Sequence, residues 1–185
     1  MSPCELNFLL STPYFRSCNL KEIASFSKHL KARKVTVGTH LFTQGEIETG
    51  WFLIREGLVS IKHRTKAGMD HLLAELTPGE AFGEMALLES RPRMASAVAV
   101  TNSVVLRLDG ETFNTLLEEN NRVACQMLRA MAITQCQRLR EMTMIMQDLT
   151  DMDSLGDYVP MSNPLDMNSV FGLFPLRSQF STGVH

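Results

Sequence analysis

The stretch FGEMALLESRPRMAS, residues 82–96, decides how the rest of the sequence is interpreted. Gly83 allows two backbone segments to approach closely, and the residues from Glu84 to Leu88 can form one short helical turn whose free N–H groups point at an anion. Arg93 adds a permanent, fork-shaped cation. Because a carboxylate such as Glu84 would repel a bare phosphate, its presence favours a ligand that also offers hydroxyl donors. The stretch therefore predicts a site for a sugar phosphate.

This stretch resembles the phosphate-binding cassette of cyclic nucleotide-binding domains, of the catabolite activator and protein kinase A regulatory type. Its Phe-Gly-Glu, Ala-Leu and Pro-Arg elements stand at the family's spacing, which is a far more specific signal than a lone glycine-rich loop. The resemblance covers roughly residues 20–150. It includes turn residues where the family places its turns, namely Gly38, Gln44-Gly45-Glu46, Gly57 and Pro78-Gly79.

The resemblance implies a role for each part of the cassette. Gly83 and Ala86 would offer backbone N–H groups to a cyclic phosphate, and Arg93 would pair with its exocyclic oxygen. Glu84 would accept a hydrogen bond from the ribose 2′-hydroxyl, and Ser96 could add a hydroxyl hydrogen bond. Replacing Arg93 with alanine is expected to abolish binding without unfolding the protein. The candidate ligand-binding residues are Phe82, Gly83, Glu84, Met85, Ala86, Arg93, Met94, Ala95 and Ser96.

Met94 departs from the family, which usually carries a small residue or a threonine after the arginine. A threonine hydroxyl there favours guanine, and methionine has no hydroxyl, so cAMP is expected as the ligand in preference to cGMP. The long side chain could instead crowd the phosphate or the base, or turn away into the barrel.

Two hypotheses for the function remain open. In the first, a stand-alone regulatory domain binds a cyclic nucleotide, switches conformation and acts through an unknown effector protein. In the second, the cradle is inherited but empty, and the chain is a ligand-free dimerisation or adaptor module. An enzyme is not expected, because the cassette has no poised base or nucleophile.

From residue 35 to residue 108 the sequence consists of short apolar or alternating runs separated by turn residues. Several short strands at this spacing are typical of an antiparallel barrel or jelly roll, and the resemblance implies the jelly roll. The predicted fold is mainly β with flanking helices, with the cassette as the one helical insertion between strands. The predicted strands are Val35–Val37, His40–Thr43, Trp51–Arg55, Leu58–Arg64, His71–Leu76, Ala97–Val100 and Val104–Leu108.

Helical periodicity flanks these strands. An amphipathic helix is predicted from Leu20 to Lys34, and a second from Glu111 to Glu119, with Asp109 as its N-cap. Helix 122–149 carries apolar residues at alternating three- and four-residue steps over about four heptads. This seam predicts a homodimer, although the helix could instead fold wholly onto its own barrel. The seam consists of Cys125, Leu128, Ala132, Gln135, Leu139, Met142, Met146 and Leu149.

In catabolite-activator-like domains this long helix is both the dimer contact and the lid over the base. The resemblance therefore makes Gln135 and Arg138 candidate lid residues, with solvated surface positions as an equal alternative. The predicted division is an N-terminal extension over 1–19, the cyclic nucleotide-binding domain over 20–150, and an extended or disordered tail over 151–185.

The tail shows no repeating helical or strand period, and it contains no second helix pair of the kind that forms a helix-turn-helix. Direct DNA binding is therefore not expected. The apolar cluster from Val170 to Leu176 could dock on the domain or on a partner, or belong to a floppy terminus.

The composition adds further expectations. The 185 residues carry a formal net charge of -2, so no global basic field attracts nucleic acid. No apolar run approaches the ~20 residues that span a membrane, and a cytoplasmic protein is expected. The cysteines form no Cys-x-x-Cys pair and the histidines are scattered, so no metal, haem or iron–sulfur cluster is expected.

Overall fold

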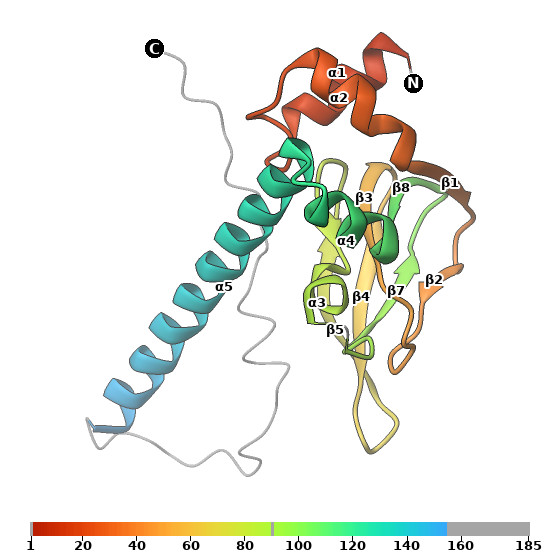
Figure 1. Cartoon of the computed structure of the whole chain (residues 1–185). Helices are drawn as coiled ribbons and strands as arrows, with labels where there is room; N and C mark the ends of the chain where they lie inside the picture. Colours follow the sequence, from red (N-terminus) through yellow and green to blue (C-terminus); the bar gives the residue numbers. More distant parts are fainter. Residues whose placement is uncertain (1, 90, 155–185) are drawn as a thin grey trace, which may run out of the picture. The chain divides into compact units, whose positions relative to one another are not determined.

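A computed structural model of the chain describes residues 2–89 and 91–154 (Figure 1). The described residues divide into two compact units. Residues 2–28 and 112–154 form a helical unit, and residues 29–111 form a unit made mostly of strands, which contains the Phe82–Ser96 cassette.

The strands form two four-stranded antiparallel sheets, with the orders β1-β8-β3-β6 and β2-β7-β4-β5 (Figure 1). Both orders bring together strands far apart in the sequence, as a jelly roll does. The predicted mainly β fold with flanking helices is confirmed. The strands are β1 Lys31–Val35, β2 His40–Phe42, β3 Gly50–Glu56, β4 Val59–Arg64, β5 Asp70–Leu76, β6 Ala81–Phe82, β7 Ser96–Ala99 and β8 Ser103–Asp109.

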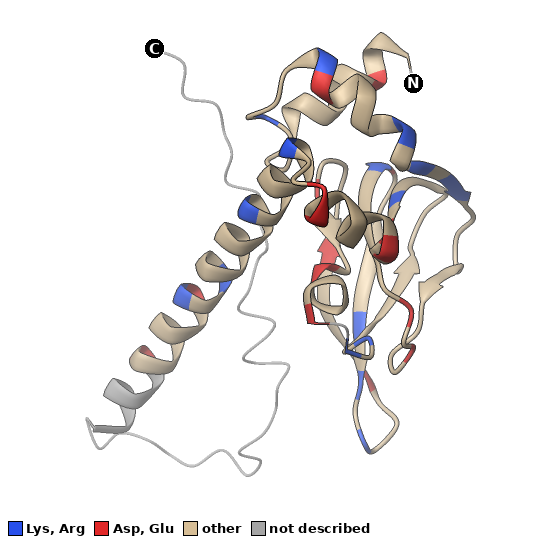
Figure 2. Ribbon diagram, viewed as in Figure 1, with Lys and Arg blue, Asp and Glu red and all other residues tan. Residues whose placement is uncertain are grey.

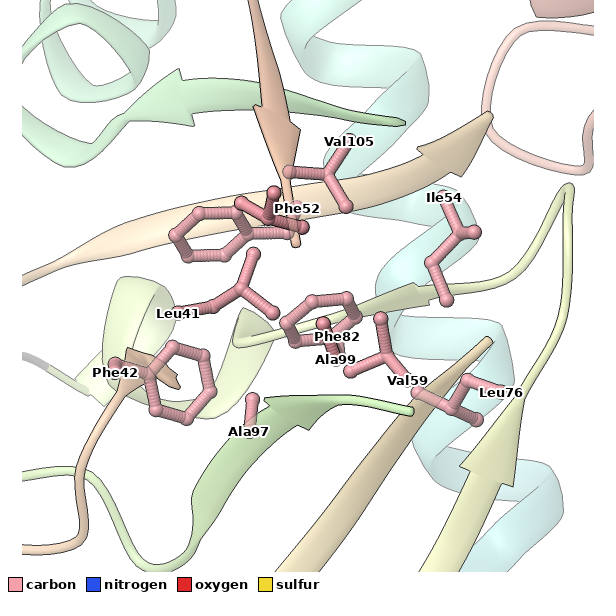
Figure 3. Packing of buried hydrophobic residues seen from close by; sticks show 11 residues of the cluster. Leu41, Phe42, Phe52, Ile54, Val59, Leu76, Phe82, Ala97, Ala99 and Val105 are labelled. Atoms are coloured by element: carbon pink, nitrogen blue, oxygen red, sulfur yellow. The ribbon is translucent and has the colours of Figure 1, made fainter. Parts of the chain in front are cut away.

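The core of this unit lies between the two sheets (Figure 3). Phe52 and Phe82 stack with their ring centroids 5.2 Å apart, and Phe42 approaches both rings from the opposite sheet, at 5.7 and 5.8 Å. Burying each such side chain contributes roughly 1.5–3 kcal/mol. The cluster holds β6, and with it the start of the cassette, against β2 and β3.

The cassette helix is α3, Glu84–Glu89. It lies between β6 and β7, where the sequence predicted the helical insertion. Strand β6 was not predicted, because two residues are too short to show an alternating pattern.

The predicted helix from Leu20 to Lys34 is wrong in its second half. Helix α2 covers Leu20–Phe26, a 3-10 turn follows at Ser27–His29, and β1 begins at Lys31. The predicted strand Val35–Val37 is correspondingly displaced. Residues 31–34 are basic or small (Figure 2), and all four are exposed. No buried helical face therefore holds them, and backbone pairing with β8 outweighs their helix propensity.

The helical unit contains α1 Pro3–Ser11, α2, α4 Gly110–Glu118, whose first two residues belong to the strand unit, and α5 Arg122–Ser154. The predicted break between α4 and α5 is confirmed: Asn120 has a φ of 55°, and the Oδ1 of Asn121 accepts hydrogen bonds from two N–H groups of the first turn of α5. An ion pair of 2.7 Å between Arg122 and Glu22 joins α5 to α2 within this unit.

Helix α5 confirms the predicted helix 122–149 and continues through Ser154. The first four residues of the predicted tail, 151–154, are therefore helical rather than extended. The rest of the tail, with the Val170–Leu176 cluster, lies outside the described residues. No described helix is both long and apolar enough to cross a membrane.

Candidate ligand-binding site

Gly83 stands at the junction of β6 and α3, and only glycine fits there. Its φ is +86°, in the left-handed region. A Cβ atom would lie 2.7 Å from Nη1 of Arg93 and 2.7 Å from the carbonyl oxygen of Gly50. The close backbone approach predicted from the sequence is thus present, and it joins the cassette to the start of β3.

The Arg93 side chain is buried, with 3% of its surface exposed. Its Nη1 donates to the carbonyl oxygen of Gly83 at 2.9 Å, and its Nη2 donates to that of Gly50 at 2.8 Å. The guanidinium carbon lies 4.0 Å from the centroid of the Phe42 ring, a cation–π distance. Its Nε has no hydrogen-bond partner among the described residues. Arg93 therefore ties together three segments of the unit, and one of its buried donors remains unused.

The backbone of Arg93 is held as firmly as its side chain. Its N–H donates to the carbonyl oxygen of Glu46 at 2.8 Å, and its carbonyl accepts from the N–H of Gly45 at 2.8 Å. This pair of bonds fixes the arginine to the turn that follows β2.

Gln44, the first residue of that turn, links two further segments. Its backbone N–H donates to Oγ of Ser96 at 2.9 Å. Its side-chain amide accepts from the N–H of Arg64 at 2.7 Å and donates to the carbonyl of the same residue at 3.1 Å. Because a hydroxyl has one donor and two acceptor positions, Ser96 keeps its own O–H for another acceptor.

Opposite charges surround Arg93. Desolvation by burial is the largest influence on its pKa and lowers it, while the carboxylates of Glu48, Glu46 and Glu84 act in the opposite direction and Arg107 adds to the lowering. Arginine still stays protonated at neutral pH. Glu84 itself is only 8% exposed. The site thus combines a buried cation, Arg93, with a buried carboxylate at the first residue of α3.

The structure brings most of the predicted ligand-binding residues together at this place. Those that are buried or half-buried are Phe82, Gly83, Glu84, Ala86, Arg93, Ala95 and Ser96. Met85 and Met94 are exposed, Met94 by 54%. Met94 therefore does not turn into the barrel, which was one of the alternatives left open.

Gln135 and Arg138 lie half-buried on α5, in the helical unit, and their role as a lid stays a prediction. The residues that the sequence missed are Phe42, Gly50 and His63, whose Nδ1 lies 2.9 Å from the carbonyl oxygen of Met94. Gly50 contacts Arg93 through its backbone carbonyl, which every residue type has, so the sequence gives no sign of this contact. Phe42 has the sequence pattern of an ordinary core residue. Among the described residues, no group of three or more His, Cys, Asp or Glu side chains could hold a metal ion.

Comparison with known proteins also points to a cyclic nucleotide-binding domain. The family model of the cyclic nucleotide-binding domain matches residues 32–120. The cyclic AMP receptor protein of Thermus thermophilus is 32% identical over 130 residues, which are 70% of this chain and 58% of that protein. The cAMP-dependent protein kinase regulatory subunit of Mycosarcoma maydis is 35% identical over 92 residues, 50% of this chain and 17% of that one.

Among solved structures, the Thermus thermophilus catabolite activator protein matches with a TM-score of 0.67 and 29% identity, over 75% of this chain and 63% of that one. The chain therefore belongs to the cyclic nucleotide-binding domain family, as the Phe82–Ser96 stretch predicted. It spans less than two thirds of either Thermus thermophilus relative.

Proposed function

We propose that this chain binds a cyclic nucleotide at the Phe82–Ser96 cassette, with cAMP preferred to cGMP, and passes the binding event to a partner protein. The observation that carries the proposal is that a cation, Arg93, and a carboxylate, Glu84, are both buried at the cassette beside Gly83. A phosphate needs the cation, and a ribose hydroxyl needs the carboxylate. A buried charged group is costly unless it is paired, and this ligand would add a partner of suitable chemistry to each of them.

The remaining donors suit a cyclic phosphate. A guanidinium has five N–H groups, of which two of Arg93 donate to carbonyl oxygens, so that three are left for an anion. The N–H groups at Gly83 and Ala86 and the O–H of Ser96 would complete the set, as in the family. In this arrangement the ligand adds bonds to Arg93 without breaking those that hold the fold.

The preference for cAMP rests on Met94. Its side chain is exposed at the cassette surface and offers no hydroxyl to a guanine. The same exposed chain would lie near any bound nucleotide, so it is also the feature that limits affinity.

Output would pass through α5 as a homodimer contact. Its seam residues Leu139, Met142 and Met146 are exposed, and leaving such a stripe in water is unfavourable unless a second copy covers it. A ligand that binds one arrangement of cassette and helix better than another shifts the population toward it. A cytoplasmic location is part of the proposal, since the four cysteines are free thiols.

The alternative is the ligand-free adaptor module, and one observation favours it. Both terminal nitrogens of Arg93 already have carbonyl partners, and the exposed Met94 stands beside them. In that case the guanidinium would serve the fold alone.

Isothermal titration calorimetry of the full chain with cAMP and with cGMP tests these two functions. Binding of cAMP, weaker binding of cGMP and weakened cAMP binding in Glu84→Gln are expected. Glu89→Gln, at the far exposed end of α3, is the matched control and should bind as the wild type does. If neither nucleotide gives a binding heat, the proposed binding function is wrong and the ligand-free adaptor module takes its place.

A further inference from the structure

His63 lies in β4 and reaches the cassette through one hydrogen bond. Its Nδ1 is 2.9 Å from the carbonyl oxygen of Met94. A carbonyl oxygen only accepts, so Nδ1 must carry the hydrogen and donate. The ring therefore holds the backbone of Met94 in its neutral Nδ1–H form as well as in its protonated form.

This bond fills a gap between two other anchors. Arg93 is fixed on one side by the backbone bonds to Gly45 and Glu46, and on the other side Ser96 pairs with Lys62 of β4 and accepts from the N–H of Gln44. Met94, between them, has an exposed side chain and so gains little from packing. The His63 ring is the side chain from β4 that ties this intervening stretch down.

The bond also sets the direction of a neighbouring donor. In a trans peptide the C=O and the following N–H point in opposite directions, and the described residues contain no cis peptide bond. With the Met94 carbonyl drawn to His63, the N–H of Ala95 must point away from β4. Ala95 is itself a buried candidate ligand-binding residue.

We propose that His63 is a positioning residue for the ligand site: its Nδ1–H holds the Met94–Ala95 peptide so that the donors from Arg93 to Ser96 are presented together. The proposal rests on the proposed function for its effect on ligand affinity. The positioning itself is a property of the protein without ligand.

Three substitutions at this position separate the donor from the bulk of the ring. In His63→Asn the amide nitrogen sits on Cγ, as Nδ1 does, and can keep the bond. In His63→Gln the amide lies further out, near the place of Nε2, and in His63→Leu no donor remains. If the ring only filled space, the leucine variant would resemble the wild type more than the smaller asparagine variant does. The hydrogen bond predicts the opposite order.

Hydrogen exchange of the amides of residues 94–96, followed by NMR on the ligand-free chain, gives the first measurement. His63→Leu and His63→Gln should exchange about three- to tenfold faster than the wild type, the factor that one ordinary hydrogen bond supplies. His63→Asn should stay within about twofold of it. In calorimetric titration with cAMP, His63→Asn should bind nearly as tightly as the wild type, and His63→Gln and His63→Leu should bind more weakly. Thermal unfolding checks that each variant folds.

Equal exchange in His63→Asn and His63→Gln, or no change in any variant, would overturn the positioning role. If the leucine variant does not fold, the comparison of the asparagine and glutamine variants still decides. If the wild type binds neither nucleotide, the proposed function fails while the exchange measurement still tests His63.

Discussion

Arg93→Met is the substitution that separates the two tasks of the arginine. Methionine keeps much of the volume but removes the charge and every donor. The carbonyl oxygens of Gly83 and Gly50 then lose their partners at 2.9 and 2.8 Å, and Phe42 loses the cation over its ring. The variant should lose stability as well as ligand binding but remain folded, in keeping with the expectation that Arg93→Ala does not unfold the protein.

The magnitude follows from opposing contributions. Two hydrogen bonds from a charged donor are worth about 1.5–3 kcal/mol each, and the cation–π contact adds about 1 kcal/mol. Against this, burial of the guanidinium, which lowers the pKa of Arg93, costs several kcal/mol that the variant no longer bears. The loss of the two hydrogen bonds outweighs this gain, because the Gly83 carbonyl keeps only the 3.4 Å bond from the N–H of Leu87 and the Gly50 carbonyl loses its charged donor. The net loss of stability should be about 2 kcal/mol.

Urea unfolding of the ligand-free chain measures this loss. With a slope of about 1–3 kcal/mol per molar, a loss of about 2 kcal/mol should lower the midpoint by roughly 0.7–2 M. Arg91→Met is the matched control, since Arg91 lies two positions earlier with an exposed side chain and a single ion pair to Glu89 at 3.6 Å. Equal midpoints for the two variants would refute the structural role of Arg93.

Three further results are expected. Met94→Ala should tighten cAMP binding about three- to tenfold in calorimetry, because it removes the exposed chain beside the site, while the similarly exposed Met69→Ala should leave it unchanged; weaker binding in the first variant would contradict this. Leu139→Glu should turn the dimer into a monomer in analytical ultracentrifugation, whereas Met144→Glu, equally exposed on the other side of α5, should not, and a monomeric wild type would rule the seam out as an interface. Cys18 should be the last cysteine alkylated by iodoacetamide at neutral pH, since burial raises the pKa of its thiol and reduces its thiolate fraction; reaction as fast as that of the exposed cysteines would count against it.

The sequence predicted what residue type and spacing encode. Gly83, Glu84 and Arg93 stand at fixed intervals, and a close backbone approach at the glycine, a helical turn and a cation beside them followed from these positions. Prediction from the sequence failed where a residue's partner is a backbone atom or a neighbouring strand. Residues 31–34 show no strand pattern of their own, because their extended structure depends on pairing with β8.

The bond from His63 to Met94 was equally invisible, since a histidine among polar residues carries no pattern. The carbonyl of Gly50 has no side chain to mark it. Contacts of this kind depend on the register of β3 and β4 against the cassette, which only the fold supplies.

The position of Arg93 explains how one residue can serve the fold and the ligand together. Its two carbonyl bonds use one set of donors, and the unpartnered Nε shows that the set is incomplete. An anion at the remaining donors would therefore add to the existing bonds, so the cation need not leave its place for the ligand to bind. Because binding to the folded state raises stability by mass action, cAMP should shift the urea midpoint of the wild type upward and leave that of Arg93→Met unmoved. A shift of equal size in both would mean that the nucleotide binds without this arginine, and the cassette would then be the wrong site.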